Sequence, residues 1–298
     1  MDKLGNVFLL LGTGICWGAT MPLTKTAVST GHQPIGLIFW QLVFSSVLLS
    51  VLVLVRGRRP HLSREFLFYF LMVGLLGTLI PNSFSYLAAA QLPAGVMAIS
   101  IATVPMFALV LALGFRIERF SARRLAGVGL GALAVVLLVG PEASLPDPAK
   151  AVFVLVALIA PFCYGLETIY IALKAPKGVD PVATLLGASL IGAIIAAPIA
   201  FSTGLFVDLT QPWGTPEWAL LTSSVFHVVA YTSYIWLIGR AGPVFSSQIA
   251  YIVTIAGVFI SSIALSETYS PWTWAALALM LGGIALVQPR RARVLEAS

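Results

Sequence analysis

Glu118-Arg119-Phe120-Ser121 and Glu267-Thr268-Tyr269-Ser270 are two matching stretches that lie 149 residues apart in a chain of 298 residues. A long apolar, glycine-containing run follows each stretch. The second half of the chain therefore repeats the first. Each half holds five long apolar segments, an odd number, so the second copy would enter a bilayer from the opposite side. This pattern predicts two inverted repeats, which we place in residues 1–145 and 146–298 of one membrane domain.

The composition indicates lipid as the solvent. Apolar residues make up 59% of the chain and charged residues only 9%, whereas a soluble domain carries about 25% charged residues. The net charge of +6 comes from short basic clusters between apolar runs, which argues against a nucleic-acid partner. The two cysteines, Cys16 and Cys163, lie inside apolar segments and have no disulfide or metal-site spacing. We therefore expect no metal and no cofactor.

Ten segments are long and apolar enough to cross a membrane as helices. Their expected ranges are 5–28, 34–55, 66–90, 93–115, 121–140, 149–173, 181–202, 216–240, 243–265 and 271–288. The fold class is therefore all-α, with ten transmembrane helices.

Basic residues alternate between the two sides of these segments. One side collects Lys3, Arg56, Arg58, Arg59, Arg64, Arg116, Arg119, Arg123, Arg124, Lys174, Lys177, Arg240, Arg290, Arg291 and Arg293. The other side has Lys150 among Glu142, Asp147, Asp208, Glu217 and Glu267. By the positive-inside rule, both termini are cytoplasmic. The short loops and the lack of an organelle signal favour a multi-pass protein of a bacterial inner membrane.

Local signals agree with this arrangement of helices. Ser121 and Ser270 stand where two helices should be capped, and Pro271 suits a first helical position. The pairs Gly14-x-x-x-Gly18 and Gly127-x-x-x-Gly131 predict close helix contacts, which we expect inside one bundle rather than between chains. Prolines that can kink a helix lie inside five segments, namely Pro22, Pro81, Pro105, Pro161 and Pro198.

Across nearly the whole chain, a set of motif residues resembles the EamA family of the drug/metabolite transporter superfamily. In chain order, they are Cys16-Trp17-Gly18, Lys25, Tyr86, Ala88, Ala89, Ala90, Pro93, Ala94, Ala98, Pro105, Glu118, Gly127, Gly131, Tyr231, Trp236, Ala241, Gly242, Glu267, Gly282 and Gly283. Thr254 departs from the pattern, because the second repeat of the family often has a proline there that answers Pro105. The resemblance, which is to bacterial amino-acid and metabolite exporters, implies ten helices, a central cavity and export of small metabolites. It does not select the substrate.

Ionisable side chains at membrane depth are costly, so each is a candidate site residue. Glu167 is the only acid well inside a segment, and it could bind an ammonium group or carry a proton; pairing with Lys174 is the alternative. His227 lies near the middle of its segment and could relay protons or act as a neutral hydrogen-bonding partner. Lys25, near an outer end, could attract a carboxylate or extend to the interface. We assign coupling to Glu167 and His227.

Aromatic residues form a second set of candidates. Trp17 and Tyr164 occupy corresponding places in the two repeats, in Cys16-Trp17-Gly18 and Cys163-Tyr164-Gly165. Tyr231, Tyr234 and Tyr251 also lie at depth, and their rings could hold an amine by cation–π contact or simply pack between helices. Neutral hydrogen bonds could come from Gln41, Asn82, Ser100, Thr103, Gln248 and Thr254. The predicted substrate site comprises Trp17, Asn82, Tyr164, Glu167, His227, Tyr231, Tyr234 and Tyr251.

These features favour a secondary transporter that exports small metabolites, amino acids or related amines, by alternating access, with proton coupling as an option. A carrier of choline, lipid headgroups or multiple drugs is the main alternative. An intramembrane enzyme is disfavoured, because the segments hold no aspartate pair and no G-x-S-x-G motif. The sequence has no Gly-rich phosphate-binding loop, so we do not expect this chain to hydrolyse ATP. The expected partners are a small-molecule substrate and the lipid bilayer, and a monomer is plausible.

Overall fold

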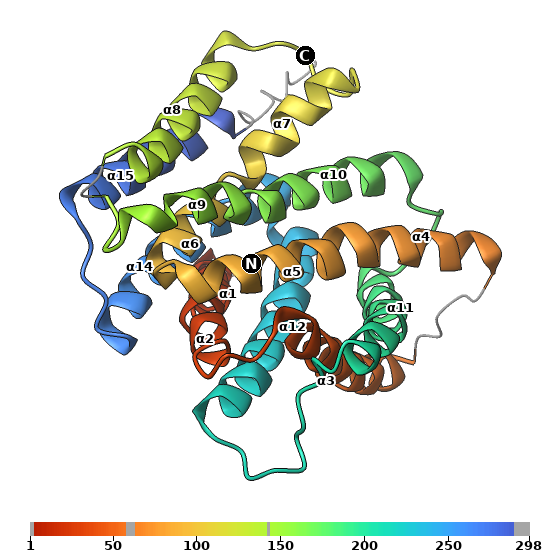
Figure 1. Ribbon diagram of the computed structural model, residues 1–298. Coiled ribbons are helices and arrows are strands. Elements are labelled where there is room, and N and C mark those ends of the chain that lie inside the picture. The colour runs from red at the N-terminus through yellow and green to blue at the C-terminus, as the bar shows by residue number, and fades with distance from the viewer. Residues whose placement is uncertain (1–2, 58–62, 142–143, 289–298) are drawn as a thin grey trace, which may run out of the picture.

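The computed structural model describes residues 3–57, 63–141 and 144–288, and for residues 3, 243 and 244 it describes the backbone alone. Arg58, Arg59, Glu142, Arg290, Arg291 and Arg293, used above to orient the chain, lie outside the described residues. Helices account for every regular element in the described part (Figure 1).

The described residues of the first half form nine helical elements. They are α1 (Lys3–Gly18), α2 (Thr20–Ala27), α3 (Pro34–Val55), α4 (Arg64–Gly74), the π-helix η1 (Leu75–Leu79), α5 (Ile80–Gln91), α6 (Ala94–Ile101), α7 (Val104–Gly114) and α8 (Ala122–Val139).

The second half contains eight helical elements among its described residues. They are the 3-10 helix η2 (Pro148–Ala151), α9 (Val152–Ala157), α10 (Ile159–Lys174), α11 (Pro181–Ser202), α12 (Thr215–Ala241), α13 (Pro243–Ser246), α14 (Ile249–Ala264) and α15 (Pro271–Val287).

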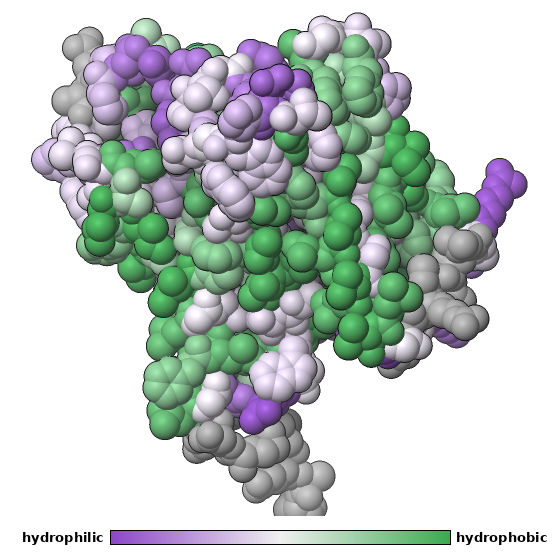
Figure 2. Space-filling view, turned by 90° about the horizontal axis from the view of Figure 1, so that it is seen from below, coloured by the Kyte–Doolittle hydropathy of each residue, from purple (hydrophilic) through white to green (hydrophobic). Residues whose placement is uncertain are grey.

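Within the described residues, eight helical stretches are long and apolar enough to cross a membrane, and two shorter apolar helices follow them. The eight correspond to the first eight predicted segments, and the shorter helices α14 and α15 occupy the last two. Large hydrophobic side chains remain exposed on the outside, including Val55 and Ile263, each at 80% of its full exposure. Figure 2 shows hydrophobic surface across the middle of one face, with hydrophilic residues gathered along one edge. Exposed apolar surface of this extent suits lipid rather than water.

Contacts between helices follow a two-fold pattern. The fifth helix of each half meets its counterpart (α8 with α15), and so does the second (α3 with α11), as Figure 1 shows at opposite ends of the molecule. The cross pairs also match: α1 packs against α14 as α10 packs against α7, and α1 packs against α12 as α10 packs against α5. The interface between the halves is therefore built from equivalent surfaces.

Four of the five prolines inside spanning segments lie a few residues after a point where the α-helix ends or becomes a π-helix. Proline has no backbone N–H, so the carbonyl four residues earlier loses its α-helical donor. For Pro22, Pro105 and Pro161, that carbonyl belongs to the residue at which α1, α6 or α9 ends. For Pro81 it belongs to Gly77, inside the π-helix η1. Pro198 is the exception, since α11 runs through it.

The sequence predictions for helix caps and glycine contacts are confirmed at some positions and wrong at another. Ser270 caps α15 by accepting a hydrogen bond from the Thr273 amide at 3.2 Å. The expectation for Ser121 is wrong for the side chain, because no side-chain hydrogen bond caps α8. At Gly127 the sequence predicts a close helix contact, and a Cβ atom added there would clash with the carbonyl oxygen of Gly283 in α15. Packing inside one bundle is thus confirmed for that glycine.

Candidate functional site

An aromatic cluster joins α1 to α12. The Trp17 ring makes edge contacts with His227 at 6.0 Å and with Tyr234 at 5.9 Å between ring centroids. His227 in turn stacks on Tyr231 at 6.4 Å. The spacing of His227, Tyr231 and Tyr234 along α12 places all three on one helix face. We call Trp17, His227, Tyr231 and Tyr234 the aromatic cluster; each keeps part of its surface accessible.

A chain of hydrogen bonds links α10, α5 and α3. The Tyr164 hydroxyl donates to Asn82 Oδ1 at 3.1 Å, and Asn82 Nδ2 donates to Gln41 Oε1 at 3.2 Å. Gln41 Oε1 also accepts a bond from the buried Tyr86 hydroxyl at 3.1 Å. The two amides are therefore held in fixed orientations. Tyr86 was not among the predicted site residues, although it belongs to the motif set that marked the family resemblance.

Glu167 lies within electrostatic range of tyrosines from both groups. Its carboxylate lies against Gly77 of η1 and interacts electrostatically with the phenols of Tyr69, Tyr164 and Tyr231. Tyr231 belongs to the aromatic cluster and Tyr164 to the hydrogen-bonded chain, so Glu167 connects the two. Glu167 and His227 do not meet directly among the contacts of the described residues; Tyr231 stacks on His227 and lies within electrostatic range of Glu167.

No basic side chain neutralises Glu167 in the described part of the molecule. The ion pairs among the described residues join Arg56 to Asp180, Arg124 to Glu118, Lys150 to Asp147 and His32 to Glu217, and none of them includes Glu167. Pairing of Glu167 with Lys174, the alternative considered above, is therefore not seen, and Lys174 is exposed. A half-buried carboxyl group at membrane depth without a counter-ion favours either a bound cation or a bound proton.

The hydroxyl groups of several predicted polar residues already donate hydrogen bonds to nearby backbone carbonyls. The hydroxyls of Ser100, Thr103 and Thr254 are buried and donate to the carbonyls of Val96, Ser100 and Ala250. Tyr251 packs against the main hydrophobic core, and its charged neighbour is Arg123. The structure thus does not bring Tyr251 to the aromatic cluster.

Lys25 and Glu267 bind the two ends of the turn that joins α5 to α6. Lys25 Nζ donates to the Ala89 carbonyl at 2.7 Å, at the end of α5. The Glu267 carboxylate accepts bonds from the amides of Ala94 and Gly95 at 2.7 and 3.2 Å, at the start of α6. Both residues line a pocket of about 240 Å³, together with Asp147 and Lys150.

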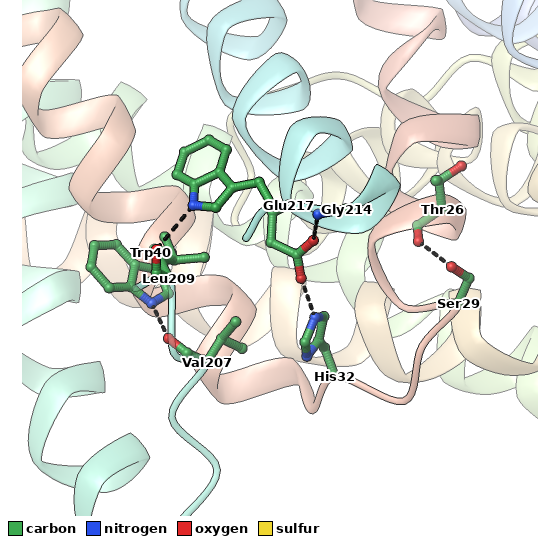
Figure 3. A network of polar contacts seen from close by, with 9 residues as sticks. Thr26, Ser29, His32, Trp40, Val207, Leu209, Gly214 and Glu217 are labelled. Carbon is green, nitrogen blue, oxygen red and sulfur yellow. Dashed lines mark hydrogen bonds and ion pairs between the residues drawn. The ribbon is translucent and has the colours of Figure 1, made fainter. Parts of the chain in front are cut away.

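The loops on the predicted outer side carry a second polar network (Figure 3). His32 Nε2 lies 2.7 Å from Glu217 Oε1, and the other carboxylate oxygen of Glu217 accepts a bond from the Gly214 amide at 2.8 Å. The Trp40 indole donates to the Val207 carbonyl at 2.7 Å. His32 escaped the sequence analysis, because nothing in its loop marks a partner that lies far along the chain. No group of three His, Cys, Asp or Glu residues in the described ranges could hold a metal ion.

Comparisons with known proteins agree with this architecture. The model of the EamA-like transporter family matches residues 4–140 and again residues 152–288. The uncharacterized inner membrane transporter YedA of Escherichia coli K12 is 25% identical over 296 residues, which covers 96% of this chain and 90% of that protein. The protein of the same name from Escherichia coli O157:H7 matches to the same extent. A chain of known crystal structure superposes with a TM-score of 0.64 at 17% identity, covering 96% of each chain, and this likeness concerns the fold alone.

Proposed function

The chain belongs to the EamA-like transporter family, and on that premise we propose that it is a secondary transporter exporting small zwitterionic or cationic metabolites, amino acids or related amines. Glu167 is the observation that carries this proposal. It is an acid without a basic partner in the described structure, and it lies at membrane depth among tyrosines from α4, α10 and α12. An intramembrane acid of this kind is a functional residue by default.

The protein is a multi-pass protein of the inner membrane, in agreement with its similarity to the inner membrane transporter YedA. We propose ten crossings, with α14 and α15 as the last two, and cytoplasmic termini. The alternation of basic residues between the two sides supports this orientation. The equivalent helix pairs within and between the halves support an inverted repeat, with residues 1–145 and 146–298 as its units.

Transport would follow from rocking of one half against the other. Trp17 and Gly77 belong to the first half, and Glu167 and the α12 residues belong to the second. Movement between the halves therefore changes the surroundings of Glu167. A site divided in this way can face each side of the membrane in turn without a continuous pore.

Proton antiport is the coupling that we propose. An unpaired carboxyl group can hold a proton when no substrate is bound and release it when an ammonium group arrives. The carboxylate of Glu167 is neutralised by the proton in one state and by the ammonium group in the other. It is therefore never left as an isolated charge. His227 remains the second proposed coupling residue, reached from Glu167 through Tyr231.

A choline, lipid-headgroup or multidrug carrier is the second candidate, and the aromatic cluster favours it. A cation over the face of a tyrosine or tryptophan ring is stabilised by about 0.5–2 kcal/mol. The cluster presents three such rings, Trp17, Tyr231 and Tyr234, around His227. Quaternary amines without hydrogen-bond donors suit such surroundings.

Uptake into liposomes tests the proposed function. Purified protein would be reconstituted and offered labelled amino acids, ethanolamine and choline, with and without an imposed pH gradient. Accumulation of an amino acid or a primary amine, driven by the gradient, is the expected result. Accumulation of choline in preference to these compounds would favour the second candidate, and uptake of none of them would contradict both.

A further inference from the structure

A pocket of about 240 Å³ lies where the two halves meet on the predicted outer face. Lys25 and Gln91 line it from the first half, and Lys150 and Glu267 line it from the second. Lys150 and Glu167 stand near opposite ends of the helical stretch Pro148–Lys174, about 25 Å apart along it at 1.5 Å per residue. The pocket is therefore separate from the surroundings of Glu167.

Several hydrogen-bond donors in this pocket have no acceptor among the described residues. The ammonium of Lys150 makes no hydrogen bond there, because its nearest acid, Asp147, lies 3.7 Å away. The side-chain amide of Gln91 also has no partner in the described part of the chain. Lys25 uses two of its three N–H groups on backbone carbonyls at the end of α5, which leaves the third without an acceptor.

The two acids that line the pocket leave these donors unused. Both oxygens of Glu267 accept bonds from backbone amides at the start of α6. Asp147 Oδ1 accepts a bond from the Ala149 amide at 3.1 Å, and the Asp147 side chain is 50% exposed. The Lys25 ammonium lies within electrostatic range of both Glu267 and Lys150. A further anion would therefore meet two cations and a set of free donors.

A second cavity of about 310 Å³ adjoins the pocket. The lining residues common to both are Pro93, Leu145, Pro146 and Thr268. None of the described residues that line the second cavity is charged. Its Ser270 and Thr273 hydroxyls already contact the Ser144 carbonyl at 3.0 and 3.1 Å. The two cavities together suit a molecule with a negative charge at one end and an uncharged body.

We propose that this pocket binds a small carboxylate on the outer face of the protein. The two oxygens of a carboxylate offer about four lone-pair sites, enough for the free donors of Lys25, Gln91 and Lys150. Bonds between ammonium and carboxylate groups are among the strong hydrogen bonds of proteins. Because Lys25 and Lys150 belong to different halves, a bound carboxylate favours the arrangement that brings them together. This site goes beyond the proposed function and does not depend on what Glu167 binds.

Ligand-dependent thermal unfolding of the purified full-length protein tests the site without requiring transport. Acetate is the probe, and chloride at equal ionic strength is the reference anion. We expect acetate to raise the unfolding temperature of the wild type above its value in chloride. Lys150→Gln should weaken the apparent affinity for acetate by about tenfold, the loss expected for one hydrogen bond between charged groups. Lys150→Arg keeps the charge and the donors, so it should retain the response.

Lys174→Gln is the matched control for the loss of one lysine charge. Lys174 is exposed and ends the helical stretch that Pro148 begins, so it lies far from the pocket. This variant should respond to acetate as the wild type does. Equal unfolding temperatures of the wild type in acetate and in chloride would overturn the site. A response to acetate as strong in Lys150→Gln as in Lys174→Gln would overturn it as well.

Chemical labelling of the wild type keeps the test decisive if Lys150→Gln does not fold. A succinimidyl ester acylates accessible lysine amines, and mass spectrometry of the peptides reports the extent of reaction at each lysine. Acetate should slow the acylation of Lys150 several-fold relative to chloride, while the acylation of Lys174 stays unchanged. Acylation of Lys150 at the same rate in both salts would contradict the proposal. Uptake into liposomes has no part in either measurement, so the failure of transport and the failure of this site remain distinct.

Discussion

Lys25 and Glu267 bind the two ends of the turn that joins α5 to α6, and they come from opposite halves of the chain. The ammonium of Lys25 holds the carbonyl end of α5, and the carboxylate of Glu267 holds the amide end of α6. Each charge has the sign that its helix end favours. The Tyr269 hydroxyl adds a third bond to Glu267 at 2.6 Å. The α5–α6 turn is thus fixed by both halves at the predicted outer face.

Glu267→Ala should destabilise the protein far more than Glu118→Ala. The first change leaves the Ala94 and Gly95 amides without acceptors, a loss of about 2–4 kcal/mol for two charge-assisted bonds at a helix start. Glu118 occupies the matching position of the first half but pairs with Arg124 at 2.9 Å on the surface, and such a pair contributes about 0–1 kcal/mol. Thermal unfolding in detergent measures the difference. Similar losses in both variants would contradict this role of Glu267.

Stability at high pH should depend on Tyr269, which lies in the connection between α14 and α15. Burial, and then the hydrogen bond to Glu267, raise the pKa of the Tyr269 phenol above its usual range. Its contribution to stability is therefore complete below about pH 10, the ordinary tyrosine pKa, and declines as the pH rises above that value. Tyr269→Phe should be less stable than wild type at neutral pH and lose less stability between neutral and strongly alkaline pH. Parallel pH profiles for the two proteins would exclude this contribution.

Thiol labelling should report on the aromatic cluster through Cys16. Cys16 is partly exposed beside Trp17, and its thiol donates to the Phe226 carbonyl at 3.5 Å. The substrate identified in liposomes should slow the reaction of Cys16 with a maleimide, and Trp17→Ala should reduce that protection. Cys163, buried at the equivalent place of the second half, is the internal control and should stay unreactive. A Cys16 that cannot be labelled from either side would make Trp17 a packing residue.

Two tyrosine variants should separate the site from the surrounding core. Tyr164→Phe removes the bond to Asn82, which costs about 0.5–1.5 kcal/mol and leaves Asn82 Oδ1 without this donor, although Asn82 still donates to Gln41. Uptake should therefore fall several-fold. Tyr251→Phe should leave uptake near the wild-type rate, because Tyr251 packs away from the cluster. Equal loss in the two variants would return Tyr251 to the site and contradict the separation.

The repeats and the helical segments could be predicted because both depend on local composition. Twenty apolar residues identify a helix wherever they pack, and the motif Glu118–Ser121 marks the repeat without any knowledge of contacts. Proline positions also carried local information, since a missing N–H acts on the carbonyl four residues earlier. Hydroxyls such as Ser121 were less predictable, because capping depends on the backbone angle at which the helix begins.

The surroundings of Glu167 could not be predicted from the sequence. The Glu167 carboxylate lies against Gly77, which is far away in the chain and belongs to the π-helical turn η1, and no local pattern marks either feature. The contact between Trp17 and His227 joins segments that are far apart in the chain, and periodicity gives the face of α12 but not its partner. The unequal fates of Glu118 and Glu267, which share a motif, likewise depend on tertiary neighbours.

Uptake by Glu167→Gln protein under an imposed pH gradient tests the central claim most directly. Glutamine keeps the size of the side chain but can neither carry the proton nor neutralise an ammonium group. The account predicts that this variant reaches the membrane in normal amount and shows no response to the gradient, whereas Glu118→Gln responds as wild type does. Gradient-driven uptake at the wild-type rate in Glu167→Gln would contradict the account.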